Sequence, residues 1–421
     1  MATPPRTTRA PKAEATGVSA ARIRLGRVFR VESKDYFLLL GTTLFLVAFG
    51  LVMVLSSSSV ASNLEEGGFF VQATRQGLYA LFGIPIMLIA SRMPEAFWMR
   101  LAWPALIVSC ALQLLVVATD LGVTVGGNTN WLAIGGVQFQ PSELIKVALV
   151  IWLGLIVTKK QAQLGDFTHG IVPILLVGGG AIALVLLGGD LGTVMIMGST
   201  LMGALFLIGV RIRLLLPPVL LGIAVFVIVA VSSESRMRRI TAFMQANCRT
   251  IDEADCWQIQ HGRFALANGG IFGVGLGNST AKWSWLPAAD NDFIFAIVGE
   301  ELGLIGAIVV IGLFVMLAIA FARVLRSART PFAKTVTAAV LVWVVGQACV
   351  NIGVVLGVFP VLGVPLPLVS AGGTALLTTL LAIGVVLSVA RDPEAATRAL
   401  ARAEARAAAR AASRPAGRPT R

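Results

Sequence analysis

The chain has 421 residues, of which 57% are hydrophobic and only 13% are charged. A water-soluble domain of this length needs more charge on its surface, so the composition excludes a soluble enzyme and indicates an integral membrane protein. The formal net charge of +13 would suit a nucleic-acid partner only if the charge lay on a folded surface.

The positive charge lies mainly in two tails. Residues 1–35 and residues 391–421 each carry eight Lys/Arg against three Asp/Glu, so the tails hold +10 of the +13 and no nucleic-acid partner is indicated. Tails rich in Ala, Arg and Pro are typical of disordered segments beside an anionic inner leaflet, with a docking role as the alternative. The first tail is too long and too basic for a cleavable signal peptide.

Residues 36–390 read as one membrane domain. Apolar runs of about 18 to 25 residues, each long enough to cross roughly 30 Å of hydrocarbon, recur along this region. We therefore predict an all-α polytopic protein with about ten transmembrane helices, near residues 36–56, 75–91, 99–119, 142–158, 170–188, 191–210, 212–232, 293–322, 333–358 and 372–390.

The distribution of Lys and Arg predicts the orientation of these helices. Under an alternating path, both tails and the loops near residues 92–100, 159–160, 211–213 and 323–334 share one basic side, which predicts a multi-pass plasma-membrane protein with both termini in the cytoplasm. The opposite side then holds residues 57–74, 120–141, 188–190 and 359–371, together with a large extracytoplasmic loop, 233–291, between helices seven and eight.

Cysteines and glycines give weaker signals. Cys110 and Cys349 lie in apolar runs and indicate core packing, whereas Cys248 and Cys256 share the large outer loop, where an oxidising compartment would permit a disulfide. The glycine series at residues 269–277 fails the spacing of a dinucleotide site. It indicates a backbone that approaches a membrane surface or a ligand closely.

Ionisable residues near the predicted outer ends of helices are the candidate site. Glu143 and Lys146 share one face of the first turn of the fourth helix, Asp190 lies in the turn before the sixth, and Asp292 opens the eighth. Each has a structural alternative: Asp292 as a helix cap, and Glu143 with Lys146 as a neutralising pair. Four such residues on one membrane face favour a polar cavity instead.

Two further acidic residues lie deeper in the eighth helix. Glu300 and Glu301 are two turns beyond Asp292, too deep to share its site easily. We therefore expect them to be buried hydrogen-bonding or interhelical residues.

Several segments, in order along residues 35–391, resemble one family. They are FQPSELIK at 139–146, DLGT at 190–193, the run from Trp257 to Gly277, NDFIFA at 291–296, GEELG at 299–303, NIG at 351–353 and PLPLVSAGG at 365–373. Together they resemble the SEDS family, the FtsW/RodA proteins. The opening of the first helix and residues 257–262 look more like its cell-division branch than its elongation branch.

The resemblance implies a ten-helix fold and a peptidoglycan glycosyltransferase that polymerises lipid II with a class B penicillin-binding protein as transpeptidase partner, among other divisome proteins at the septum. Carried over by position, Asp292 matches the essential aspartate, and the matched substrate-cavity and outer-loop residues are Glu143, Lys146, Asp190, Ser370, Gly372 and Gly373.

The sequence departs from the family pattern in two places. Before the aspartate, Ala288 and residues 290–291 replace a common Leu-Pro-Glu and His-Thr, and residues 128–131 read NTNW where many members carry arginine. Roles assigned to that glutamate or arginine elsewhere therefore cannot be transferred to this chain.

The implied chemistry needs a base and a cation. A polyprenyl diphosphate is already a good leaving group, so the enzyme must mainly accept the proton of the acceptor hydroxyl, a role we assign to Asp292. Either Lys146 or a divalent ion, Mg²⁺ or Mn²⁺, held by Asp190 and Glu143 could offset the diphosphate charge, and no organic cofactor is expected. Attack opposite the leaving group would convert an α-linked donor into a β-linked product.

Other functions stay open at this point. A lipid II flippase would need alternating access and often shows internal repeats, a divisome scaffold would not need Asp292, and an elongation polymerase would share the chemistry but not the septum. The loop 233–291 is long and contains aromatic residues, among them Trp257, Phe264, Phe272, Trp283 and Trp285. We therefore expect a folded, partly amphipathic lid over the active site that contacts the penicillin-binding partner.

Overall fold

The computed structural model of the protein describes residues 33–391 apart from 126–127, 135–136, 245–253 and 284. The ten apolar helices of these ranges are α1 (Lys34–Glu66), α2 (Val71–Ala90), α3 (Glu95–Ala118), α4 (Pro141–Lys160), α5 (Val172–Leu187), α6 (Leu191–Leu207), α7 (Ile212–Ser232), α10 (Ile294–Ser327), α11 (Pro331–Val355) and α12 (Gly373–Ala390). Within the described part of the chain, nine are long and apolar enough to span a membrane, and α6 is a shorter apolar helix. The polytopic all-α prediction is confirmed, while most of both predicted tails lies outside the described residues.

Local chemistry explains where several helices begin. The side chain of Ser33 accepts a hydrogen bond from the N–H of Tyr36 at the start of α1, and Thr330 does the same for Ala333 at the start of α11. Pro141 occupies the first turn of α4, where its missing N–H would have no partner in any case. A 3₁₀ turn (Gln161–Gln163) and a π-helical turn (Phe167–Ile171) connect α4 to α5.

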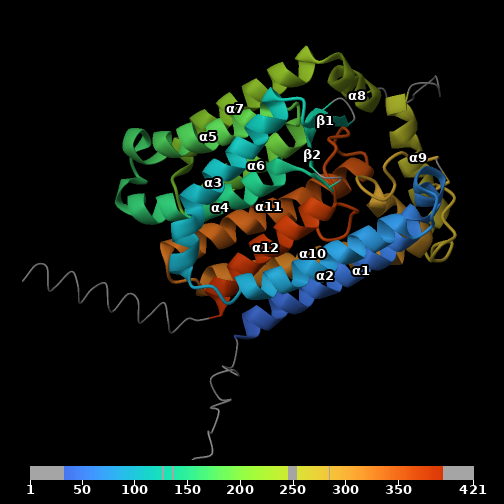
Figure 1. Cartoon of the computed structure of the whole chain (residues 1–421), viewed down its shortest axis with the longest axis horizontal. Helices are drawn as coiled ribbons and strands as arrows, with labels where there is room; N and C mark the ends of the chain where they lie inside the picture. The colour runs from blue at the N-terminus through green and yellow to red at the C-terminus, as the bar shows by residue number, and fades with distance from the viewer. Residues whose placement is uncertain (1–32, 126–127, 135–136, 245–253, 284, 392–421) are drawn as a thin grey trace, which may run out of the picture. The chain divides into compact units, whose positions relative to one another are not determined.

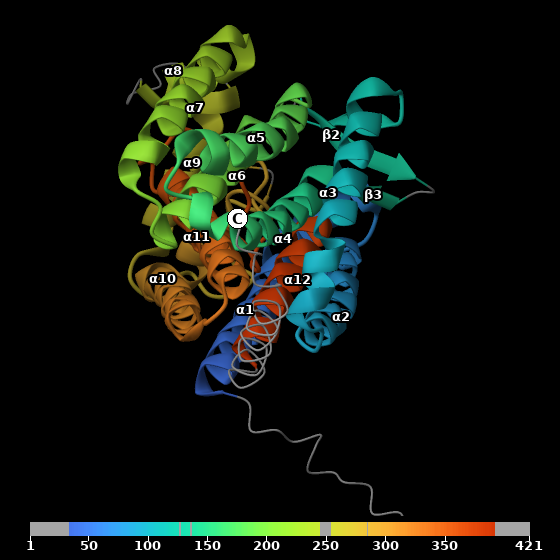
Figure 2. The same ribbon diagram turned by 90° about the vertical axis from the view of Figure 1, so that its left-hand side faces the viewer.

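Helix α4 lies at the centre of the bundle and α7 at its edge. In their most apolar stretches, 83% of α4 is buried inside the protein against 11% of α7. Helix α4 packs on α3, α11 and α12, and these neighbours surround it when the helices are seen roughly end-on (Figure 2). The polar residues at the start of α4 are therefore enclosed by protein.

The connections divide between the two ends of the bundle. The Ser33 hydroxyl donates to the carbonyl of Ala390 at 3.1 Å, so both ends of the described chain meet at the same end. The strands and helices α8 (Glu234–Met244) and α9 (Ala254–Gly269) gather at the opposite end (Figure 1). The placement of the two tails themselves stays a prediction, because both lie almost entirely outside the described residues.

A small antiparallel sheet occupies the polar segment between α3 and α4, which the sequence prediction treated only as an outer loop. Strands β1 (Gly122–Val125), β2 (Asn128–Ile134) and β3 (Val137–Phe139) pair in the order β1-β2-β3, with Leu132 opposite both Gly122 and Phe139. The N–H of Thr129 donates to the carbonyl of Gly188 at 2.9 Å. The sheet therefore joins the turn that carries Asp190.

Helix α10 is interrupted at Gly303, whose φ of 68° and ψ of −165° are not helical. The glycine series at residues 269–277 supplies hydrogen-bond partners for the backbone groups at this break. The N–H groups of Val274 and Gly275 donate to the carbonyls of Glu300 and Glu301, both at 3.0 Å, and the N–H of Leu304 donates to Gly270 at 2.9 Å. Backbone groups freed inside an apolar helix need such partners.

The glycines in this contact have a structural reason. A Cβ on Gly273, which has a φ of 81°, would collide with the carbonyl of Glu301, and a Cβ on Gly269 would collide with the carbonyl of Gly299. The close approach expected of this series is made at Gly269 and Gly273, and a contact of the series with a membrane surface or a ligand stays a prediction. The close partner of the series is the backbone of α10, because strand-like pairing across the helix break requires the two main chains to touch.

Candidate functional site

Glu143 and Lys146 form a buried ion pair in the first turns of α4. The Lys146 Nζ lies 2.7 Å from Glu143 Oε1, and Lys146 and Glu143 are 5% and 3% exposed. Thr378 of α12 donates to Glu143 Oε2 at 3.1 Å. Lys146 also donates to Gln347 of α11 at 3.4 Å and lies 4.8 Å above the ring of Trp343. Both charges are therefore balanced and enclosed by three helices.

Asp190 caps the start of α6 and reaches across to the start of α4. Its Oδ1 accepts from the N–H of Thr193 at 2.9 Å, and its Oδ2 accepts from the Thr193 hydroxyl at 2.7 Å and from Gln140 Nε2 at 3.1 Å. Burial raises the pKa of Asp190, the Thr193 hydrogen bonds oppose this rise, Lys146 lowers the pKa and Glu143 raises it. These three ionisable residues thus share one electrostatic neighbourhood.

Asp292 is a carboxylate of a different kind. It lies two residues before α10, and its shielded Oδ1 has no hydrogen-bond partner among the described residues. The pKa of Asp292 is raised to about 7: burial has the largest effect and raises it, Asp190 and Asp290 also raise it, and Arg239 lowers it. At neutral pH a large share of this carboxyl group is therefore ionised and able to accept a proton.

A glycine, Gly363, lies next to this carboxylate. A Cβ built on Gly363 would lie 3.7 Å from Asp292 Oδ2, and Gly363 has a φ of 68°, a conformation that favours glycine. Gly363 belongs to the α11–α12 connection, which we define as residues 356–372. Most of the second half of this connection is buried, from Val364 at 6% to Ser370 at 6% exposed.

Three predicted site residues remain. Ser370 and Gly372 lie in this connection and Gly373 follows it directly, but only Ser370 contacts the chain around Asp292. The Ser370 hydroxyl donates to the carbonyl of Asn291 at 2.6 Å. The N–H of Gly372 instead donates to Gln76 of α2 at 3.2 Å, and a Cβ on Gly373 would collide with Tyr79 of α2. The structure thus places both glycines at the contact between α2 and α12.

Glu300 and Glu301 are fully buried, as predicted for hydrogen-bonding residues. Asn268, Ser279 and Thr280 all donate to the Glu300 carboxylate. Glu301 accepts from the Ser56 hydroxyl of α1 and lies 3.5 Å from Lys282 Nζ. These contacts fasten the loop after α9 to the interrupted part of α10.

The segment between α7 and α10, residues 233–293, is folded in its described parts. Arg236 of α8 donates to the carbonyls of Gly189 and Val229 at 2.7 and 3.2 Å, so α8 lies against the turn that carries Asp190. Trp257 and His261 of α9 stack with centroids 4.1 Å apart, and the ring of Trp285 stacks beside them. The folded character predicted for this segment is confirmed there.

Two further predictions concern a disulfide and a divalent cation. Cys248 lies outside the described residues and the side chain of Cys256 is not described, so their disulfide stays a prediction. In the described part of the chain no three His, Cys, Asp or Glu residues cluster to hold a metal ion. Asp190 and Glu143 already accept hydrogen bonds or an ion pair, so this donor set does not fit a divalent ion. A cation requirement stays a prediction.

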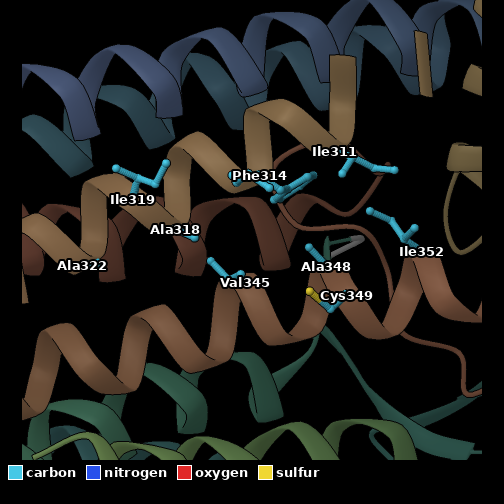
Figure 3. A pocket seen from close by; sticks show the side chains of 10 residues that line it. Ile311, Phe314, Ala318, Ile319, Ala322, Val345, Ala348, Cys349 and Ile352 are labelled. Atoms are coloured by element: carbon cyan, nitrogen blue, oxygen red, sulfur yellow. The ribbon is translucent and has the colours of Figure 1, made fainter. Parts of the chain in front are cut away.

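An apolar groove lies between α10 and α11 (Figure 3). It has a volume of about 350 Å³ and is lined by Ile311, Phe314, Val315, Ala318, Ile319, Ala322, Val345, Ala348, Cys349 and Ile352. Its lining carries no charged side chain, so it cannot orient a sugar or a diphosphate. The candidate reaction site is therefore the region of Asp292, Asp190, Glu143 and Lys146, and not this groove.

Sequence reasoning assigned no role to four residues of this region: Gln347, Asn351, Gly363 and Arg239. Asn351 donates to the carbonyls of Asp292 and Val364, both at 2.8 Å. A polar side chain within an apolar helix is a functional candidate by default, so Gln347 and Asn351 carried a signal in α11. Arg239 and Gly363 lie in loops or polar segments, where that signal is absent.

Comparisons with known proteins agree with this architecture. The family model FtsW/RodA/SpoVE, described as "Cell cycle protein", matches residues 36–395. The probable peptidoglycan glycosyltransferase FtsW of Mycobacterium tuberculosis is 35% identical over 380 residues, covering 90% of this chain and 72% of that protein. The protein of the same name from Geobacter metallireducens is 36% identical, covering 85% and 95%.

Solved structures share the fold. A chain from the structure described as "Structural coordination of polymerization and crosslinking by a peptidoglycan synthase complex" aligns with a TM-score of 0.68 and 24% identity, covering 87% of this chain and 99% of that one. The rod shape determining protein RodA of Thermus thermophilus aligns with a TM-score of 0.62 and 23% identity over the same shares.

Proposed function

Because the chain belongs to the FtsW/RodA/SpoVE family of cell-cycle proteins, we propose that it is a peptidoglycan glycosyltransferase that polymerises lipid II at the division septum. The single observation that carries the mechanism is the carboxylate of Asp292, whose shielded Oδ1 has no hydrogen-bond partner in the described structure. Relatives named for division at 35–36% identity favour septal synthesis over elongation.

In the proposed reaction Asp292 acts as the general base. It accepts the proton of the acceptor sugar hydroxyl while that oxygen forms a bond to the anomeric carbon of the donor and the polyprenyl diphosphate leaves. A pKa near 7 suits this role, because the base must be ionised before reaction yet basic enough to hold the proton. The space beside Gly363 is the approach we assign to the acceptor hydroxyl.

Glu143, Lys146 and Asp190 complete the proposed substrate cavity. Lys146 is already paired with Glu143, so we assign the pair a role in fixing the charge of the cavity. Asp190 raises the pKa of Asp292 and thereby tunes the base. Ser370 acts through the backbone of Asn291. We derive no step through a metal ion.

The proposed partner is a class B penicillin-binding protein, which would crosslink the strands that this chain polymerises. The solved relative comes from a peptidoglycan synthase complex that couples polymerisation to crosslinking, and this supports the proposal. We further propose that both termini are cytoplasmic, that the α7–α10 segment forms an outer lid over the cavity, and that other septal proteins join the assembly.

One observation favours the transporter alternative. Unwound helices within membranes often bind substrate or ions in transporters, and α10 is interrupted at Gly303. Here, however, the carbonyls of Glu300 and Glu301 and the N–H of Leu304 are bonded to the glycine series, so they are not turned toward a transport path. The polymerase function is the better supported one.

The decisive experiment combines the purified protein, its penicillin-binding partner and labelled lipid II. Wild-type protein should produce glycan strands, and Asp292→Ala should bind the partner normally but produce none. A parallel assay for movement of fluorescent lipid II across vesicles separates the alternatives. Transport without polymer, unaffected by Asp292→Ala, would reject the proposal. Depletion in cells should give filaments if the role is septal and rounding if it is elongation.

A further inference from the structure

The backbone carbonyls of residues 290–292 each accept a hydrogen bond from a segment much later in the chain. The N–H of Ala371 donates to Asp290 at 2.9 Å, the Ser370 hydroxyl donates to Asn291 at 2.6 Å, and Asn351 Nδ2 donates to Asp292 at 2.8 Å. We call these three bonds the carbonyl clamp. Its donors come from α11 and the α11–α12 connection, at least 59 residues further along the chain.

The two side-chain donors of the clamp are themselves fixed. Asn351 is 1% exposed and uses its amide a second time, donating to the carbonyl of Val364 at 2.8 Å. The Ser370 hydroxyl accepts from the N–H of Leu366 at 2.8 Å. Each side chain therefore ties the chain at Asp292 to the α11–α12 connection, and neither can turn away without breaking two bonds.

The clamp matters because it fixes the main chain that carries the Asp292 carboxylate. Its Oδ1 has no hydrogen-bond partner among the described residues. The chain before it also makes a strained turn: Ala288 has a φ of 51°, and its carbonyl accepts from the N–H groups of Asn291 and Phe293, both at 3.1 Å. The hydrogen bonds of its main chain therefore help to set the position of the carboxylate.

We propose that Asn351 and Ser370 are positioning residues for Asp292, which hold its backbone so that the carboxylate faces the acceptor hydroxyl. This inference rests on the proposed function, in which Asp292 is the base. Neither side chain touches the carboxylate in the structure, and a reacting group must be held within a fraction of an ångström to be effective. The clamp supplies that restraint through three carbonyls that belong to consecutive residues.

Substitutions that remove the donors should lower kcat. Asn351→Ala leaves two buried carbonyls without a partner, and we expect kcat for lipid II polymerisation to fall by about tenfold to a hundredfold while KM changes less than about twofold. Ser370→Ala should act in the same direction with a smaller loss. Ser370→Thr retains the hydroxyl and should restore most of the rate.

The matched control is Thr335→Ala. Thr335 is also a buried polar residue of α11, but its hydroxyl donates within the helix to Pro331 at 2.8 Å and belongs to no part of the site. This variant should polymerise at the wild-type rate. Thermal unfolding in detergent then shows whether each variant is folded before its kinetics are interpreted.

Hydrogen exchange provides a readout that does not depend on activity. In Asn351→Ala and Ser370→Ala, the amides of residues 288–293 and 364–371 should exchange faster than in wild type, while α4 and the far half of α11 keep their protection. Thr335→Ala should leave both segments unchanged. If Asn351→Ala does not fold, the comparison of Ser370→Ala with Ser370→Thr carries the test.

The outcomes are separable from those that test the function. If the wild type forms no polymer, the proposed function fails, yet hydrogen exchange still decides whether the clamp orders residues 290–292. If the wild type is active and both donor variants retain its kcat, or lose rate only through KM, or show unchanged exchange in both segments, the positioning proposal is overturned.

Discussion

Two carboxylates in the site show how the same chemical group can have opposite roles. Glu143 accepts from Lys146 and Thr378 and is matched in charge, whereas Asp292 has a shielded oxygen without a partner among the described residues and a pKa raised to about 7. A carboxylate whose charge is already balanced gains little by accepting a proton. The comparison teaches that reactivity belongs to the incompletely satisfied group, and that its fully bonded neighbour sets the surrounding charge.

The largest expected effect comes from removing the carboxylate of Asp292, the reactive one of the two. Asp292→Asn keeps the shape of the side chain but removes the base, so polymerisation should fall by at least about a hundredfold, the scale of general base catalysis. Expression, thermal stability and partner binding should stay near those of the wild type. Polymerisation at close to the wild-type rate would remove Asp292 from the mechanism.

The next largest effect should come from breaking the ion pair between Glu143 and Lys146. Lys146→Met leaves Glu143 buried without its cation, and breaking such a pair typically costs about 3–5 kcal/mol of stability. We expect a lower unfolding temperature in detergent. The double substitution Glu143→Gln with Lys146→Met removes both charges and should recover much of that loss. An unchanged unfolding temperature in Lys146→Met would show that the pair does not stabilise the folded protein.

The charge on Asp190 acts on Asp292 and is itself influenced by Glu143. Removing this charge should alter the pH dependence of the polymerisation rate. Asn is as good a helix cap as Asp, so Asp190→Asn keeps the start of α6 while deleting the negative charge that raises the pKa of Asp292. The acid limb of the rate profile should move to lower pH. We also expect a loss in rate of at least about tenfold, equal to roughly 1.4 kcal/mol of transition-state stabilisation.

An acid limb that stays at the wild-type pH in Asp190→Asn would show that the two carboxylates are not coupled. The same profile separates this coupling from a purely structural role of Asp190. A structural role would lower the rate at every pH without moving the limb.

The smallest expected effect tests the contact between the glycine series at residues 269–277 and α10. Gly273→Ala would press a Cβ against the carbonyl of Glu301, whereas a Cβ on Gly270 meets no atom within 4 Å, although both glycines have positive φ. Both changes incur the backbone cost of about 1 kcal/mol, and Gly273→Ala should cost measurably more. Equal unfolding temperatures for the two variants would contradict the close pairing of the glycine series with α10.

The helices could be predicted from the sequence because each one is determined by the residues of its own segment. Apolar runs of spanning length predicted ten helices, and the described α4, α7 and α12 begin or end within a few residues of the expected positions. The pairing of Glu143 with Lys146 followed from a spacing of three residues on one helix. Such features depend only on neighbours in the chain and on the lipid solvent.

Features that depend on distant partners could not be predicted in the same way. The sheet of residues 122–139 and the break at Gly303 both need hydrogen bonds from another segment. The role of Asn351 depends on a carbonyl 59 residues away. Hydropathy reports the surroundings of a segment but not which backbone group it will meet, so these contacts required the three-dimensional structure.

The most direct test of the account is the single-turnover rate of lipid II polymerisation, measured from about pH 5.5 to 8.5 for wild type and Asp292→Asn. Because the ionised form of Asp292 is the base and its pKa is about 7, the wild-type rate should be constant at high pH and fall about tenfold for each unit below 7. The residual rate of Asp292→Asn should be low and independent of pH over this range. A wild-type rate that does not change with pH, or a variant that keeps both the rate and the acid limb, would contradict the assignment of Asp292 as the base.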